Sequence, residues 1–270
     1  MMLTPSEFIE SYALTGEKKT KAATLKLFML AILAGFFIGL GGAVTNIASS
    51  TISNPSVTKI INGMLFPFGL IMVLLTGSEL FTGNCLITIS LLEKRATFLG
   101  MLRNLFIVYI GNFVGAVLLA YACVYSGQIS FSISATFKTA AAKCSLNFSN
   151  AIIFGILCNI LVCVGVMCGL CGKSITGRSV GAYIPIAFFV ICGFEHCIAN
   201  MYYIPAGLFA KIIPEYLEAA TKNGINLTNL TWKNFLVCNL LPVTIGNIIG
   251  GCIFSALIWA GHSKKKEYHQ

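Results

Sequence analysis

The stretch Gly193-Phe194-Glu195-His196-Cys197-Ile198-Ala199-Asn200 places a carboxylate, an imidazole and an amide in the middle of a long apolar run. Apolar residues flank it over 182–192 and 201–210, so the whole run is long enough to cross a lipid bilayer. Ionisable side chains are costly at membrane depth, and those found there usually serve a function. The stretch therefore indicates a membrane span with a functional polar interruption at its centre.

The composition is that of an integral membrane protein embedded in a lipid bilayer. Of the 270 residues, 57% are hydrophobic and 10% are charged, whereas soluble domains contain about 25% charged residues. The apolar runs are too long for the strands of a barrel, so we expect an all-α fold. The net charge of +9 comes from basic residues that flank these runs, which favours a role in topology over nucleic-acid binding.

Six membrane spans are expected, at about 25–49, 60–92, 98–125, 148–170, 180–210 and 235–260. A short amphipathic helix over 3–19 precedes them, and we expect it to lie on the membrane interface. The expected units are an N-terminal segment 1–24, a first three-span repeat 25–126, a loop 127–147, a second repeat 148–260 and a basic tail 261–270.

The distribution of basic residues predicts the topology. With the N-terminus inside, 12 of the 18 basic residues fall on inside segments, so both termini are expected in the cytoplasm and the protein in the plasma membrane. The inside set is Lys18, Lys19, Lys21, Lys26, Lys94, Arg95, Arg103, Lys173, Arg178, Lys264, Lys265 and Lys266.

The two halves of the chain carry the same motifs. Gly77-x-Glu79-x-x-x-x-Asn84 matches Gly193-x-Glu195-x-x-x-x-Asn200 at an offset of 116 residues, and Gly-Asn-x-x-Gly recurs at 111 and 246. Each copy has three spans, so the second copy is inverted in the membrane. Interrupted helices at matching positions of inverted halves point to a transport site at the midplane.

The two interruptions differ in their ionisable side chains. The helix N-termini that follow them carry partial positive charge, which favours an anion. We expect Glu79 and Glu195 to be structural, each accepting hydrogen bonds from backbone N–H groups freed within its own half; direct proton handling is the alternative. Asn84 and Asn200 recur and belong to the same scaffold. His196 does not recur, because Leu80 stands at the matching position, so His196 is the better candidate to face a transported ion.

The residues that could support enzyme chemistry are few. Most of the 11 cysteines lie in apolar runs and are expected to be small buried side chains. Cys168 and Cys171 form a CxxC without a second pair at metal-site spacing. The chain has three histidines, no aspartate and no HExxH motif. We therefore expect no catalytic residues, no metal and no cofactor, and we disfavour a membrane enzyme.

Three motifs together resemble the formate/nitrite transporter family over nearly the whole chain. They are Leu80-Phe81-Thr82-Gly83-Asn84, Gly193-Phe194-Glu195-His196-x-Ile198-Ala199-Asn200-Met201 and Asn239-Leu240-Leu241-Pro242-Val243-Thr244-x-Gly246-Asn247-Ile248-x-Gly250-Gly251. The resemblance implies an aquaporin-like fold of six helices, with the second and fifth interrupted, and a homopentamer with a pore in each subunit. The Asn-Pro-Ala motif of aquaporins is absent from both interruptions.

The resemblance also implies roles for single residues. His196 matches the central pore histidine of the family, and Thr82 matches the threonine in the loop that interrupts the second helix. The other implied positions are Leu80 and Phe81 in that loop, Phe66, Leu70 and Phe189 at the cytoplasmic constriction, Asn159 and Val162 near the pore and the outer constriction, and Lys143 and Lys19 as lysines near the pore.

These observations predict a channel or transporter for a small monovalent weak-acid anion. Moving such an ion into a low-dielectric medium costs on the order of 20 kcal/mol by Born estimates. A neutral acid suffers far less, so we expect transport to depend on protons and on His196. Formate is the first candidate; nitrite, hydrosulfide, acetate and lactate fit equally. An aquaporin-like channel for a small neutral solute is the alternative.

Overall fold

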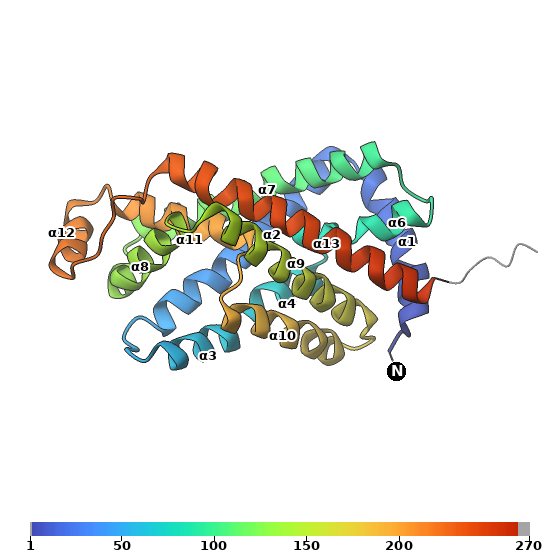
Figure 1. Ribbon diagram of the computed structural model, residues 1–270, viewed down its shortest axis with the longest axis horizontal. Coiled ribbons are helices and arrows are strands. Elements are labelled where there is room, and N and C mark those ends of the chain that lie inside the picture. The colour runs from blue at the N-terminus through green and yellow to red at the C-terminus, as the bar shows by residue number, and fades with distance from the viewer. Residues whose placement is uncertain (1, 264–270) are drawn as a thin grey trace, which may run out of the picture.

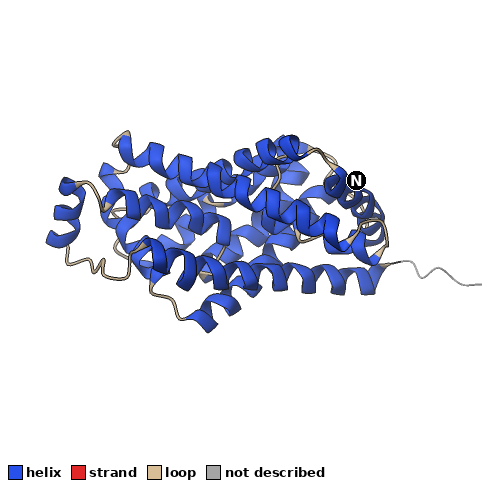
Figure 2. Cartoon of the chain, turned by 90° about the horizontal axis from the view of Figure 1, so that it is seen from above, coloured by secondary structure: helices blue, strands red, loops and turns tan. Residues whose placement is uncertain are grey.

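The computed structural model describes residues 2–263, which form a bundle of helices joined by loops (Figures 1 and 2). Among these residues, six segments are long and apolar enough to cross a membrane. They are α2 (Thr24–Ala48), α3 with α4 (Pro55–Leu65 and Pro67–Thr76), α7 (Phe98–Tyr125), α9 (Phe148–Cys171), α10 (Ile175–Cys192) and η2 with α13 (Asn234–Leu240 and Leu241–His262).

Shorter apolar helices complete the second and fifth spans. The second span continues after a break as α5 (Phe81–Asn84) and α6 (Ile87–Leu92), and the fifth continues as α11 (Cys197–Ala210). Each break begins at a glycine in the left-handed region, Gly77 with φ 69° and Gly193 with φ 74°. Glycine adopts this conformation without the steric cost that a Cβ imposes. The predicted fold class, with interrupted second and fifth spans, is confirmed.

The two halves are packed in the same way. Gly111 and Gly115 of α7 lie against carbonyl groups of α2, while Gly246 and Gly250 of α13 lie against carbonyl groups of α9. A Cβ at any of these positions would collide with the facing backbone. Small residues at this spacing let helices approach closely in a membrane. The Gly-Asn-x-x-Gly motifs therefore hold the third and sixth spans against the first and fourth.

Helix α1 (Pro5–Lys21) begins at a capping box, in which Thr4 and Glu7 bind each other's backbone N–H groups. Its apolar face, with Phe8, Ile9 and Tyr12, is buried, and α1 packs on α6, α7 and α13. The expectation that this face rests on the membrane is wrong, because the bundle itself covers it.

Two further helices lie where the sequence indicated polar loops. Helix α8 (Ile133–Cys144) lies within the segment expected as a loop over 127–147, and α12 (Pro214–Lys222) lies between the fifth and sixth spans. Helices α1 and α8 lie at opposite ends of the bundle (Figure 1). We call these ends the Lys19 end and the Lys143 end, after a lysine on each helix. The terminal lysines 264–266 lie outside the described residues.

Candidate functional site

The two helix breaks meet inside the bundle. Thr82 Oγ1 of the first break lies 3.0 Å from His196 Nε2 of the second, and both side chains are buried. This contact joins residues 114 positions apart in the chain. The inverted repeat had predicted that the two interruptions lie together, and the structure brings them into direct contact.

The hydrogen bonds of His196 define its protonation. Its Nδ1 accepts a bond of 3.1 Å from the backbone N–H of Ala199. The proton of the neutral ring is therefore on Nε2, which donates to Thr82 Oγ1. The ring also stacks on Phe189, with centroids 5.9 Å apart and planes at 17°. A second proton would have to displace the Ala199 bond, so this arrangement favours the neutral ring.

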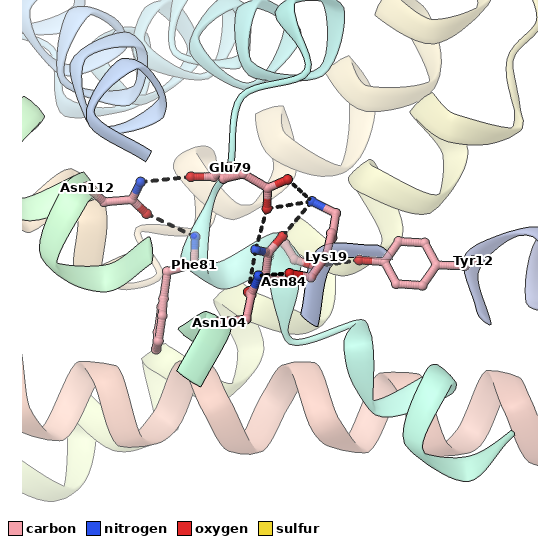
Figure 3. A network of polar contacts seen from close by, with 8 residues as sticks. Tyr12, Lys19, Glu79, Phe81, Asn84, Asn104 and Asn112 are labelled. Atoms are coloured by element: carbon pink, nitrogen blue, oxygen red, sulfur yellow. Dashed lines mark hydrogen bonds and ion pairs between the residues drawn. The ribbon is translucent and has the colours of Figure 1, made fainter. Parts of the chain in front are cut away.

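Asparagine side chains bind the broken backbone. In the first half, Asn112 Nδ2 donates to the carbonyl oxygens of Ala31 (2.7 Å) and Glu79 (2.9 Å), and its Oδ1 accepts from the N–H of Phe81 (2.9 Å) (Figure 3). These bonds replace those that the missing helical turn would have made. Backbone groups left without partners in a membrane interior would be costly.

The carboxylate of Glu79 lies in a second cluster of polar contacts. Lys19 Nζ donates to Glu79 Oε1 (2.8 Å), to Glu79 Oε2 (2.7 Å) and to Asn84 Oδ1 (3.0 Å) (Figure 3). Asn84 Nδ2 donates to Glu79 Oε2 (2.7 Å) and to Asn104 Oδ1 (2.8 Å). Asn104 Nδ2 in turn donates to the carbonyl oxygen of Lys19 (3.0 Å). This cluster ties α1 and α7 to the break.

The backbone contacts of the second break match those of the first. Asn247 Nδ2 donates to the carbonyl oxygens of Gly155 (2.8 Å) and Glu195 (3.0 Å). Its Oδ1 accepts from the N–H of Cys197 (2.9 Å). Asn247 therefore does in the second half what Asn112 does in the first.

The carboxylate cluster also recurs. Lys143 Nζ donates to Glu195 Oε1 (2.8 Å). Asn200 Nδ2 donates to Glu195 Oε2 (2.6 Å) and to Asn239 Oδ1 (2.7 Å), and Asn239 Nδ2 donates to the carbonyl oxygen of Lys143 (2.9 Å). The repeat therefore includes α1 and α8, which carry the two lysines.

This geometry corrects the predicted role of the glutamates. Each carboxylate does bind within its own half, but its donors are lysine and asparagine side chains rather than backbone N–H groups. The backbone is held instead by Asn112 and Asn247. Sequence reasoning missed Asn104 as a partner of this cluster. A signal was present, because Asn104 precedes Asn112 by the same eight residues that separate Asn239 from Asn247.

Two cavities approach the contact between the breaks from opposite ends of the bundle. The cavity at the Lys19 end has a volume of about 230 Å³ and is lined by Lys19, Leu70 and Leu80 among others. The cavity at the Lys143 end has a volume of about 160 Å³. Between them lies a gap of about 10 Å³, which is at the lower limit for holding one water molecule. The gap is lined by Ile38, Phe66, Leu70, Leu80, Val162, Ile186, Phe189 and His196.

Phe66, Leu70 and Phe189, which were predicted to form one constriction, all line the gap. Phe66 and Phe189 line the cavity at the Lys143 end, where their rings are in edge contact at 5.6 Å, whereas Leu70 lines the cavity at the Lys19 end. One helical turn separates Phe66 from Leu70, about 6 Å along the axis, so each of them also lines a different cavity. Val162 lies in the gap itself.

Phe81 and Asn159, two further residues predicted to lie at the pore, make contacts elsewhere in the bundle. The ring of Phe81 packs on Tyr109, with centroids 4.8 Å apart, and does not line either cavity or the gap. Asn159 is fully buried, and its Nδ2 donates to the carbonyl oxygens of Asn247 (2.6 Å) and Thr82 (3.3 Å). Asn159 therefore braces the backbone of the first break against α13.

The described part of the chain also bears on metal binding and on disulfide formation. Residues 2–263 contain no group of three or more His, Cys, Asp or Glu side chains placed to hold a metal ion. The 11 cysteines are unpaired, and most of them are buried.

A helical membrane bundle of two matched halves, with broken spans meeting between two cavities, has the architecture of a channel or transporter. A family model described as "Formate/nitrite transporter" matches residues 6–261. The chain belongs to the formate/nitrite transporter family.

The chain is similar to several named members. It is 36% identical to the formate channel FocA of Haemophilus influenzae over 93% of this chain and 91% of that protein. It is 33% identical to FocA of Escherichia coli K12 over 99% and 97%. Among solved structures, it resembles a "pentameric formate channel with formate bound" with a TM-score of 0.77, at 33% identity over 88% of this chain and 96% of that one.

Proposed function

We propose that the protein moves formate, or a closely related small weak-acid anion, across the membrane together with a proton. The observation that carries this proposal is the contact between His196 and Thr82, which joins the two helix breaks at a narrow gap between two lysine-bearing cavities. The relatives named as formate channels make formate the first substrate to test.

The lysines account for the approach of an anion. Lys19 and Lys143 line the two cavities, and their side chains are 20% and 15% exposed. Each is paired with a glutamate, so it is held in place without a net positive charge that would trap an anion. In such a site the N–H groups that a lysine does not give to its own cluster can donate to a small anion, and the paired carboxylate prevents tight binding.

The apolar lining of the gap explains why a proton would accompany the anion. Seven of its eight lining residues are apolar. A carboxylate entering this space would lose its hydration, at a cost of several kcal/mol even after relaxation. A protonated acid is neutral and crosses at much lower cost. The anion therefore takes up a proton in the cavity and loses it on the other side.

His196 serves as a fixed hydrogen-bond donor within this gap. Its Nδ1 is occupied by the N–H of Ala199, so the proton that joins the anion comes from cavity water rather than from the ring. Its Nε2 donates to Thr82 Oγ1, which is fully buried, so Thr82 fixes the orientation of the ring beside the gap.

The assembly and topology form part of the same proposal. The 33% identical solved neighbour is a pentamer, and we propose a homopentamer with a pore in each subunit for this chain. Exposed large apolar side chains on α2, α7 and α13 supply surfaces for lipid and for neighbouring subunits. The bias of basic residues supports cytoplasmic termini and a location in the plasma membrane.

Flux in liposomes tests the proposal. Purified protein in vesicles under a clamped membrane potential should take up formate faster as the external pH falls, and the other small weak acids should compete. Flux that does not change with pH would contradict proton-linked transport. Equal passage of glycerol or ammonia, without competition by weak acids, would favour the neutral-solute channel instead.

A further inference from the structure

The Lys143 cluster lacks two hydrogen bonds that the Lys19 cluster has. Lys19 Nζ binds both oxygens of Glu79 and also Asn84 Oδ1. Lys143 Nζ binds Glu195 Oε1 and has no other hydrogen-bond acceptor within residues 2–263. The oxygen that would complete the match, Asn200 Oδ1, is buried and has no hydrogen-bond partner in the described chain. The other missing bond is the one from the lysine to the second glutamate oxygen, whereas the asparagine contacts of the first cluster recur in the second.

The position of Tyr203 explains why Lys143 does not donate to Asn200 Oδ1. Lys143 Nζ lies 5.5 Å from the centre of the Tyr203 ring, over its face, which attracts a cation. The ring is itself fixed, because Tyr203 Oη lies 2.7 Å from Thr45 Oγ1, whose proton is given to the carbonyl oxygen of Gly42. The position that matches Tyr203 in the first half is Ile87, which offers no such ring to Lys19.

Lys143 has N–H groups without an acceptor, and it lines a cavity suited to a small anion. Lys143, Tyr203, Thr139 and Asn62 line the cavity at the Lys143 end together with Phe189 and His196. Lys143 keeps two N–H groups without an acceptor in the described chain. Unpaired polar groups are costly in a buried site and are satisfied at little cost by a ligand that carries matching atoms.

We propose that Tyr203 is a positioning residue that holds Lys143 away from Asn200, so that this end of the pore binds the anion directly and the Lys19 end does not. The proposal rests on the proposed function and assigns its anion-capturing end. Without the ring, the ammonium of Lys143 would turn to Asn200 Oδ1 and reproduce the saturated arrangement of Lys19.

Half-saturation constants measured from each face test this assignment. Wild-type protein and Tyr203→Leu are placed in vesicles of known orientation, with equal pH on both sides and a clamped potential, and formate is supplied from one face at a time. In Tyr203→Leu the half-saturation concentration from the Lys143 face should rise roughly threefold to tenfold, without a lower maximal rate. From the Lys19 face it should stay close to wild type.

Controls separate this role from a structural one. Tyr203→Phe keeps the ring and should behave nearly like the wild type, whereas a merely structural defect would lower the maximal rate from both faces. An equal rise in half-saturation from both faces would overturn the proposal, as would a lower maximal rate with unchanged half-saturation.

A second readout does not depend on transport. The reaction of each lysine with a small amine-directed reagent is followed by mass spectrometry in the folded protein. Lys143 should react faster than Lys19 in the wild type, and Tyr203→Leu should slow Lys143 towards the rate of Lys19. Unchanged reactivity of Lys143 would overturn the role of Tyr203. Absence of formate flux in the wild type would instead refute the proposed substrate.

Discussion

The break over 77–84 and the break over 193–200 share a backbone scaffold but differ in the side chains where they meet. Asn112 and Asn247 bind the two broken backbones through matching bonds. At the contact itself, His196 stands where the first half has Leu80, and Thr82 is opposite it in the other half. The repeated contacts hold the backbone in place, which leaves the side chains at the contact free to differ between the two halves.

The largest effect is expected from breaking the shared scaffold. Asn112→Leu and Asn247→Leu each remove three hydrogen bonds from buried backbone groups. Each group left unpaired costs about 1–3 kcal/mol, so both variants should lose most folded protein to a similar extent. Size-exclusion profiles and thermal unfolding in detergent measure this loss. Asn46→Leu is the control, because Asn46 Nδ2 has no partner in the described chain. Normal stability of either scaffold variant would contradict the shared role.

The unrepeated histidine should matter more for transport than for folding. His196→Phe keeps an aromatic ring beside Phe189 but removes the donor to Thr82 and the acceptor of the Ala199 N–H. The unpaired N–H should lower the stability by about 1–3 kcal/mol. Loss of a fixed donor in a dry site lowers rates by roughly 100-fold, and we expect formate flux to fall by about that factor. Leu80→Met, at the matching position, should retain flux. Undiminished flux in His196→Phe would place the transport path elsewhere.

The hydroxyl of Thr82 should have a smaller effect. Thr82→Val keeps the shape of the side chain and removes one hydrogen bond, so flux should fall roughly threefold to tenfold. Thr82→Ser restores the hydroxyl and should recover most of the rate. Ile198 occupies the matching position of the second half, and Ile198→Val should leave flux close to wild type. A Thr82→Ser variant as slow as Thr82→Val would show that packing, rather than the hydroxyl, is responsible.

The smallest expected effect is a difference in stability between the two lysines. Lys19→Met removes three hydrogen bonds and Lys143→Met removes one, and each leaves a buried glutamate unpaired. Both variants should unfold at lower temperature, and Lys19→Met should be the less stable by about 1 kcal/mol per additional bond. Lys21→Met is the exposed control, with an expected change of less than about 1 kcal/mol. Equal melting temperatures for the two buried variants would remove the asymmetry between the ends.

Much of the fold could be predicted because long apolar runs and paired glycines are local signals. The spans and both breaks follow from hydrophobic length and from the recurrence of Gly77 and Gly193. The break between α3 and α4 was missed although Pro67 marks it, because apolar residues continue through it. Helices α8 and α12 were missed because short helices in polar segments are stabilised by packing, which a pattern of residue types does not show.

The candidate site was predictable only in part. His196 and Thr82 were identified from motifs and the two lysines from the family resemblance. In the structure His196 contacts Thr82, and each lysine lines one of the two cavities. The cavity that each gap residue lines was not predictable from the sequence. Only one helical turn separates Phe66, which also lines the cavity at the Lys143 end, from Leu70, which also lines the cavity at the Lys19 end. The missing partner of Asn200 was not predictable either, because it depends on the orientation of a single lysine side chain over Tyr203.

The asparagines that bind the broken backbone also constrain the order in which the protein is made. The N–H of Phe81 is bound by α7, which emerges from the ribosome after it, and the N–H of Cys197 is bound by α13, the last helix described. Neither break has its partners when it first enters the bilayer. The N–H of Cys197 gains its asparagine partner only after the final span has been inserted, so the second break is the last part of the bundle to be completed.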